Sequence, residues 1–227
     1  GGNTHRTNAI IKLNSILSDK LSFENQLYYS NYFFNLNYDA TFFADDSING
    51  DQLRQREHRD VFGYNSKLRH ITYLPGGAAL HSTLGAGWQF NEIHNSELSH
   101  TVNKNTVLEY LQFGNIKETV LNAFADETLL AGKWLINGGA RLDYLNFNYA
   151  DKLNSPQRPR SKVIVSPKFN IEYTASNAIQ IYLKTGKGFH SNDSRVVAEN
   201  NGVEILPAAY GADFGINWKP FSHLYIN

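Results

Sequence analysis

The densest run of charged side chains in the sequence is Arg54 to Asp60, which reads Arg-Gln-Arg-Glu-His-Arg-Asp. If this run is a β-strand, Arg54, Arg56 and His58 share one face, because alternate residues of a strand point the same way. Cationic side chains arranged like this could bind an anionic chelate through charge-assisted hydrogen bonds, provided that their face lines a lumen. The alternatives are a solvated loop, or ion pairs with whatever fills that lumen. We therefore predict these three residues as candidate ligand contacts.

A second candidate is the polar segment that begins at His190 and contains the residue types of a hydrolytic triad. Serine, histidine and aspartate all lie within residues 190–194. Such crowding cannot easily place the base between the nucleophile and the carboxylate, so a polar strand end and loop explains the segment better than catalysis does. We predict no catalytic residue. As candidate ligand contacts in this loop we take His190, Asn192, Asp193 and Arg195.

Two further groups of residues are of types that can bind a metal or a phosphate. His94 and His100 stand near Glu92 and Glu97, and all four could bind a metal, but their spacing matches no compact site. The Gly-Lys-Gly-Phe segment at 186–189 lacks the glycine and lysine spacing of a phosphate-binding loop. Its glycines fit a strand position that another chain segment approaches closely. We therefore predict no metal and no cofactor.

The composition excludes several classes of protein. The 227 residues include 21 basic and 21 acidic side chains, so nothing in the net charge favours binding to nucleic acid. There is no cysteine, and hence no disulfide or cysteine-based metal site. No apolar run approaches the ~20 residues of a membrane-spanning helix. The 13 Tyr, 14 Phe and 3 Trp would suit the aromatic girdles of a membrane β-barrel.

The elements that position these residues alternate in polarity. From Lys162 to Ala175 one parity is polar, apart from Ile164, and the other is apolar or aromatic. A period of two puts the sets on opposite faces of a strand, here one long enough to cross a bilayer when tilted. Pro167 lies inside the run and lacks an amide hydrogen, so we expect a bend or bulge there, and a regular strand from Lys168 onward.

The same pattern recurs along the chain and predicts about ten strands. The connections alternate between short and long. Short ones follow Leu17, Tyr73, Leu130, Ala175 and Trp218, and long loops are predicted at about 39–60, 92–115, 151–161 and 190–206.

This rhythm favours an all-β fold, a segment of an antiparallel up-and-down transmembrane β-barrel with short periplasmic turns and long extracellular loops. The apolar face would meet lipid and the polar face a lumen, because only a closed barrel gives every backbone group in lipid a partner. A soluble barrel or a β-sandwich is the alternative, but these seldom sort their loops to opposite ends. Within the lumen, the charged side chains Lys133, Arg141, Asp143, Lys168, Glu172 and Lys184 would contact each other or a domain inside the barrel.

Three segments carry a resemblance to a known family. Thr185 to Arg195 reads TGKGFHSNDSR, Ile205 to Pro220 reads ILPAAYGADFGINWKP, and Ser166 to Phe169 reads SPKF. Together they resemble motifs of the TonB-dependent outer-membrane receptors. Ala208 stands where these receptors often have glutamate, whereas Asp213 keeps an acidic residue. Residues 1–160 resemble the family only in the rhythm of strands and loops.

The resemblance implies a barrel of about 22 strands, of which residues 1–227 would be a part. It places a plug domain, a TonB box, a signal peptide and further C-terminal strands outside this stretch. The implied function is uptake of a scarce ligand, namely an iron–siderophore or other metal chelate, a cobalamin or a glycan. The implied partners are this ligand, outer-membrane lipid and the TonB complex, in the outer membrane of a Gram-negative bacterium. A passive porin-like channel or adhesin, an outer-membrane hydrolase and a soluble β-barrel binding protein are the alternatives.

Overall fold

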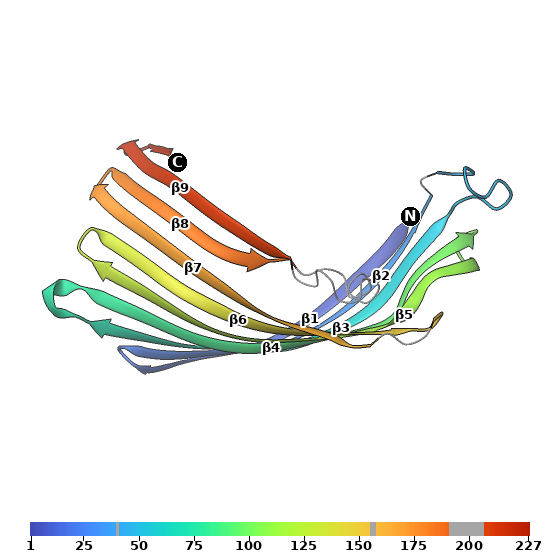
Figure 1. Cartoon of the computed structure of the whole chain (residues 1–227), viewed down its shortest axis with the longest axis horizontal. Helices are drawn as coiled ribbons and strands as arrows, with labels where there is room; N and C mark the ends of the chain where they lie inside the picture. Colours follow the sequence, from blue (N-terminus) through green and yellow to red (C-terminus); the bar gives the residue numbers. More distant parts are fainter. Residues whose placement is uncertain (40, 155–157, 191–206) are drawn as a thin grey trace.

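The computed structural model describes residues 1–39, 41–154, 158–190 and 207–227. These residues form one sheet of ten antiparallel strands, ordered in space as in the sequence. The sheet curves into an open trough whose edges are β1 and β10 (Figure 1). The predicted all-β, up-and-down class is therefore confirmed, although the sheet does not close on itself. No helix in the described part of the chain is long and apolar enough to cross a membrane.

Most strands are far longer than the 5–6 residues typical of globular proteins, and β5 alone has 26. The strands are β1 (Gly2–Ser18), β2 (Leu21–Tyr38), β3 (Leu53–Tyr73), β4 (Ala79–Val102), β5 (Thr106–Ala131), β6 (Trp134–Asp151), β7 (Arg160–Ser176), β8 (Ile179–Phe189), β9 (Ala208–Phe221) and β10 (Leu224–Ile226), with one 3₁₀ turn, η1 (Pro75–Gly77), before β4.

The connections at one end of the strands are short, as predicted, and we call this the short-turn end. At the other end, the long-loop end, two predictions were wrong. No long loop follows Asn91, because β4 and β5 continue and meet in a turn at Asn103 and Lys104, both with positive φ. The first loop ends at Leu53 rather than at Asp60, so the charged run belongs to β3. The charged run and residues 92–106 are largely polar on both parities, which removes the alternation by which a strand is recognised.

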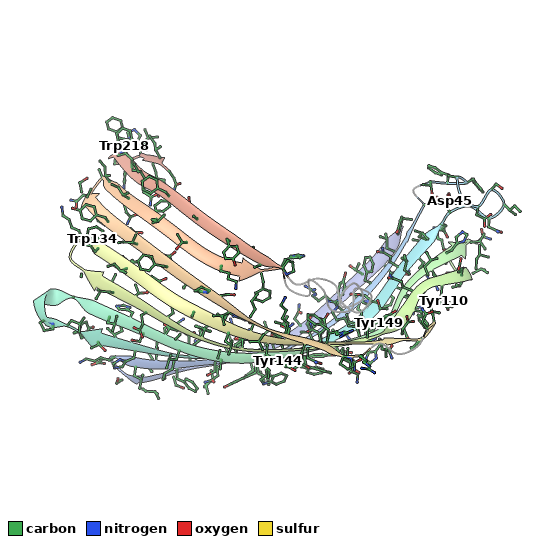
Figure 2. The ribbon with its side chains drawn as sticks, in the orientation of Figure 1. Asp45, Tyr110, Trp134, Tyr144, Tyr149 and Trp218 are labelled. Carbon is green, nitrogen blue, oxygen red and sulfur yellow. The ribbon has the colours of Figure 1, made fainter. Side chains whose placement is uncertain are left out.

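The pairing register keeps one face of the sheet apolar across six strands. The row of ladder partners Leu27, Tyr64, Trp88, Leu121, Tyr144 and Val163 runs without interruption from β2 to β7. This apolar face lies on the convex side of the trough, where Figure 2 shows Tyr144, whereas Tyr149 lies on the concave side. The alternate residues, which are mostly polar, lie on the concave face, so the predicted division into two faces is confirmed.

Pro167 does not produce the expected bulge against β6, since its partner is Ala140 and the register continues on both sides. On the other side of β7, pairing with β8 stops at Lys168, directly beside the proline. A residue without an amide hydrogen fits this place, where the ladder ends on one side only.

Glycines on the concave face make room for aromatic rings on neighbouring strands. Gly63 is the ladder partner of Tyr28, and Gly85 is the partner of Phe124. A Cβ added to Gly63 would lie 2.2 Å from the Tyr28 ring, and one added to Gly85 would lie 2.3 Å from the Phe124 ring. The rings lie flat over the backbone, which any side chain at the glycine would prevent.

Buried apolar side chains gather on the concave face toward the long-loop end. Leu145, Phe147 and Ile164 form one cluster, and Val120 and Phe189 pack against it. A second cluster consists of the ladder partners Ile93, Ile116 and Tyr149. These clusters stabilise the wall of the sheet where its outward side chains are mostly polar.

Candidate functional site

The structure places Arg54, Arg56 and His58 on the same face of β3 as Phe62 and Tyr64. The pairing of β2 with β3 has no register shift, so alternation carries the apolar parity through the charged run. The three side chains thus lie on the convex face, which also carries the apolar side chains of β3, at the long-loop end. The condition on which they were predicted as chelate contacts, a luminal face, is not met.

Arg54 is committed to an ion pair within the protein. Its Nη2 lies 2.6 Å from Oε1 of Glu97, and the side chains are only 12% and 6% exposed. The Nε of Arg54 donates to the same oxygen at 2.8 Å, and Ser99 Oγ donates to it at 2.6 Å. This buried arginine holds β3 against β4 and is not available to a ligand.

Arg56 and His58, by contrast, are exposed. The Arg56 guanidinium stacks over the ring of Phe33 at 5.6 Å. The His58 ring lies 6.3 Å from that of His94, and its Nε2 is 2.7 Å from Nδ2 of Asn31. These contacts orient the two side chains without neutralising the arginine.

His190 directly follows β8 and is exposed, and its amide donates to the carbonyl of Pro207 at 3.1 Å. Asn192, Asp193 and Arg195 lie outside the described residues, as do the two serines of the hydrolase alternative. The predicted ligand role of these residues therefore stays a prediction.

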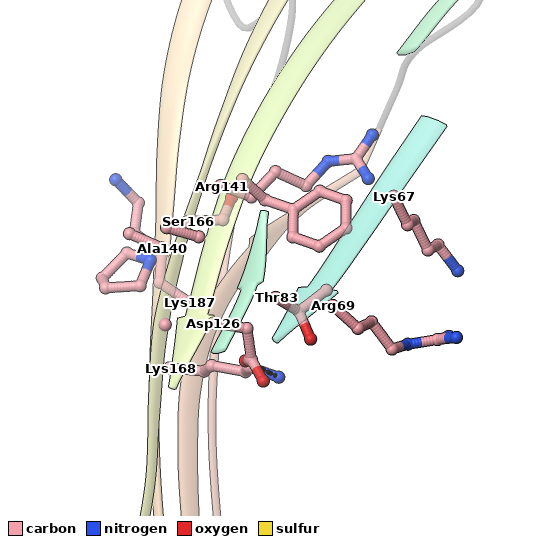
Figure 3. Close-up of a pocket in the computed structure, with 13 residues that line it drawn as sticks. Lys67, Arg69, Thr83, Asp126, Ala140, Arg141, Ser166, Lys168 and Lys187 are labelled. Atoms are coloured by element: carbon pink, nitrogen blue, oxygen red, sulfur yellow. Dashed lines mark ion pairs between the residues drawn. The ribbon is translucent and has the colours of Figure 1, made fainter. Parts of the chain in front are cut away.

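The concave face carries a hollow of about 480 Å³ among basic side chains (Figure 3). Most of these cations are paired with an acid. Lys168 Nζ lies 2.6 Å from Oδ2 of Asp126, and Arg141 Nη2 lies 2.8 Å from Oδ1 of the buried Asp143. Figure 3 shows the Lys168 and Asp126 side chains meeting at the base of the hollow.

Beside it lies a second hollow of about 480 Å³, lined by Lys12, Lys67, Arg141, Glu24 and several amide side chains. Arg69, from the first hollow, forms an ion pair with Glu24. Lys12 and Lys67 form no ion pair within the described part of the chain. Their charged ammonium groups therefore face the open space of the hollow. Sequence reasoning identified Arg141 and Lys168 but missed Lys67, Arg69 and Asp126, because β3 and β5 alternate poorly in sequence.

The first loop at the long-loop end is held by two aspartates. The Asp51 carboxylate accepts hydrogen bonds from the amides of Ala44, Asp45 and Asp46 at 2.7–3.2 Å. These amides lower the pKa of Asp51 to about 2, mainly through the bond from Asp46. The Asp46 carboxylate in turn accepts from the amides that follow it, which lowers its pKa. The loop is thus an ordered platform.

The loop exposes Phe42, Phe43 and Ile48, which are 67%, 60% and 86% exposed. His100 ties it to β4, with Nε2 2.6 Å from the carbonyl oxygen of Gly50. No cluster of three or more metal-binding side chains occurs in the described ranges. Of the residues considered above for a metal, His94 and Glu92 form a pair, with Nε2 and Oε2 4.0 Å apart.

An open sheet of long up-and-down strands, apolar on its convex face and polar on its concave face, defines the wall of an outer-membrane-type β-barrel. The sequence profile described as "TonB dependent receptor-like, beta-barrel" matches residues 1–221. The chain therefore belongs to the TonB-dependent receptor family. No curated protein matches it.

Solved structures show the same fold. The ferric citrate transporter FecA in its unliganded form is 14% identical with a TM-score of 0.81, over 95% of this chain and 32% of that one. BauA, the ferric preacinetobactin receptor from Acinetobacter baumannii, is 12% identical with a TM-score of 0.74, over 96% of this chain and 35% of that one. The copper transporter OprC is 15% identical with a TM-score of 0.70, over 96% of this chain and 37% of that one.

The chain thus spans about a third of the length of these structures. The family is one of receptors, and these neighbours are named as receptors and transporters, not as enzymes. The resemblance stated for residues 161–220 is confirmed, and the family match extends it to nearly the whole chain.

Proposed function

We propose that this chain forms part of the barrel wall of an outer-membrane receptor that takes up a scarce ligand with energy supplied through TonB. The observation that carries the proposal is the apolar row from Leu27 to Val163, which continues across six strands on the convex face. A continuous apolar surface of this kind suits contact with lipid acyl chains, and TonB-dependent receptor barrels are outer-membrane proteins of Gram-negative bacteria.

Aromatic side chains lie at both ends of the apolar part of β6. Trp134 stands at the short-turn end against Tyr173 of β7, with ring centroids 4.5 Å apart. Tyr144 stands ten residues further on the same face. At ~3.3 Å per residue and a tilt of ~45°, this separation gives a band of roughly 24 Å, the height expected of an outer-membrane barrel. The spacing of these aromatic side chains supports a wall that crosses the membrane, with the trough as part of the barrel lumen.

For the ligand we propose a metal chelate, since the structural neighbours are named for ferric citrate, ferric preacinetobactin and copper. The predicted contacts His190, Asn192, Asp193 and Arg195 come directly after β8 in the sequence, and β8 ends at the side of the sheet where ligand would enter. Lys12 and Lys67 project from the wall into the proposed lumen, where an anionic chelate or a plug domain could meet them. Cobalamin and glycan remain alternative ligands.

Growth of a Gram-negative host on ferric chelates as the sole iron source tests this proposal. Deletion of the gene should abolish growth on one chelate, and dissipation of the proton gradient or deletion of TonB should abolish uptake of that chelate. Uptake that persists without TonB would identify a passive porin-like channel instead. Heat-modifiable gel mobility in detergent distinguishes any membrane barrel from a soluble β-barrel binding protein.

A further inference from the structure

We propose that His58 of β3 and His94 of β4 form a binding site for a divalent transition-metal ion such as Zn²⁺ on the convex face. The site goes beyond the proposed transport function, because it lies on the outer surface of the sheet and not in the trough. It requires neither a transported ligand nor contact with lipid. The two histidines lie far apart in the sequence and meet only through the pairing of β3 with β4.

The two imidazoles stand opposite each other. His58 and His94 are ladder partners, so their side chains leave the same face of the sheet at neighbouring positions. Their ring centroids are 6.3 Å apart. Two imidazoles bound to one tetrahedral Zn²⁺, each with a Zn–N distance of about 2 Å, have centroids roughly 5 Å apart. A rotation that moves one ring by about 1 Å therefore brings both histidines within reach of the same ion.

His58 presents a nitrogen that carries no proton. Its Nε2 lies 2.7 Å from Nδ2 of Asn31. The same Nδ2 donates to Oδ1 of Asp60 at 2.8 Å, which identifies it as the amide nitrogen and hence as a donor only. The Nε2 of His58 therefore accepts, and the lone pair that accepts is the one that a metal ion binds. An ion at Nε2 would replace one hydrogen bond of Asn31 and leave its bond to Asp60 intact.

Glu92 supports His94 from the same face of β4. Its Oε1 lies 2.9 Å from Nζ of Lys117, and its Oε2 lies 4.0 Å from Nε2 of His94. The lysine thus fixes the carboxylate with its second oxygen toward the imidazole. A carboxylate next to one ring nitrogen of a ligating histidine orients the ring and leaves the other nitrogen for the metal. Each histidine of the pair therefore has a polar side chain that holds its ring.

The charges around the pair are compatible with a bound cation. The next row of the ladder consists of two acids, Asp60 and Glu92. No lysine or arginine pairs with Asp60 in the described ranges, and its carboxylate interacts electrostatically with both imidazoles. The opposing charge is that of Arg56, whose guanidinium stacks over the ring of Phe33. The two carboxylates outnumber this arginine, so the site does not repel a divalent ion.

The site is open to solvent and has room for water. His58 is exposed, and the side chain of His94 is 43% exposed. Both line a hollow of about 330 Å³, to which Glu57 also contributes. The ladder shifts directly after His94, where Asn95 has a φ of 51°, and bulges of this kind re-aim side chains at functional sites. Two imidazoles with water in the remaining positions suit Zn²⁺ or Cu²⁺, whereas Ca²⁺ and Mg²⁺ prefer oxygen ligands.

Isothermal titration with Zn²⁺ tests the site. The complete gene product is purified in detergent without a histidine tag and is freed of metal with a chelator. His58→Gln and His94→Gln each remove one ligand. His70→Gln with His223→Gln removes two exposed histidines elsewhere in the chain and is the matched control. Heat-modifiable gel mobility confirms that each variant is folded before it is compared.

The wild type and the control should bind one Zn²⁺ more per molecule, at micromolar concentration, than either single variant. Glu92→Gln should weaken this binding by about 10-fold, the cost of losing a group that orients a ligand. His94→Cys keeps a metal ligand and should bind Co²⁺ with a thiolate-to-cobalt charge-transfer band, which a histidine of purely structural role would not predict.

Three results would overturn the site. The first is equal Zn²⁺ binding by the wild type and both single variants. The second is binding that needs millimolar Zn²⁺, which would show an adventitious ion only. The third is displacement of Zn²⁺ by an equal concentration of Ca²⁺, which would indicate oxygen ligands in place of the two imidazoles.

Discussion

The ion pair between Arg54 and Glu97 should dominate the stability of the long-loop end of β3 and β4. Both side chains are close to fully buried, at 12% and 6% exposure. Loss of one partner from such a pair costs ~3–5 kcal/mol, because the other charge stays buried without compensation. Glu97→Gln keeps the shape and a neutral acceptor for Arg54 and Ser99. We therefore expect a smaller cost, about 2–3 kcal/mol, which is the worth of a hydrogen bond to a charged group.

Hydrogen exchange measured by mass spectrometry tests this value. Amides of residues 97–102 should exchange about 30- to 150-fold faster in Glu97→Gln, the factor that corresponds to 2–3 kcal/mol of easier local opening. Amides near the short turns should not change.

Two further variants control the interpretation. Glu92→Gln breaks the more exposed pair with Lys117, whose side chains are 54% and 28% exposed, and should change exchange by less than about fivefold. Arg54→Met with Glu97→Leu replaces the buried pair by apolar side chains and should restore most of the protection. Exchange in Glu97→Gln that matches Glu92→Gln would refute the assignment of this stability to the buried pair.

Three other changes have defined outcomes. Gly85→Val forces a Cβ to 2.3 Å from the Phe124 ring and should lower the free energy of unfolding in denaturant by ~1–3 kcal/mol; an unchanged midpoint would contradict the close approach. Leu145→Ala opens a cavity in a buried cluster and should cost ~2–5 kcal/mol in the same assay. The pKa of Asp51 is lowered to about 2, so its contribution to the first loop is complete above about pH 4 and is lost as the pH falls toward 2. Limited proteolysis with pepsin should therefore cut the loop increasingly below about pH 4, and constant resistance down to pH 2 would contradict this role.

The family could be recognised from sequence because its motifs are local. Residues 185–195 and 205–220 keep the glycine, aromatic and proline positions of a strand end and a strand start, and the family match bears them out. Alternation likewise located strands such as β6 and β7, in which one face is apolar from Trp134 to Tyr144 and from Val163 to Ala175. The short turns were predictable for the same reason, since each is a brief polar interruption between two alternating runs.

The candidate site was much less predictable, and β3 shows why. Its charged run has no alternation that identifies a strand, so whether Arg56 points inward or outward depends on the register that connects it to Phe62. The partners of the charged side chains also lie far away in the sequence. Arg54 meets Glu97 across 43 residues, a contact that exists only once β3 and β4 have paired.

The class of fold, the two faces of most strands and the family can be read from the amino-acid sequence, because they follow from a period of two and from local motifs. The ends of β3, β4 and β5 at the long-loop side became clear only from the pairing of the strands, since polar strands beyond the apolar surface carry no periodic signal. It also decided that Arg56 and His58 share the outward face, and that a bulge at Asn95 brings His94 beside them. These facts depend on pairing between strands, which no single segment specifies alone.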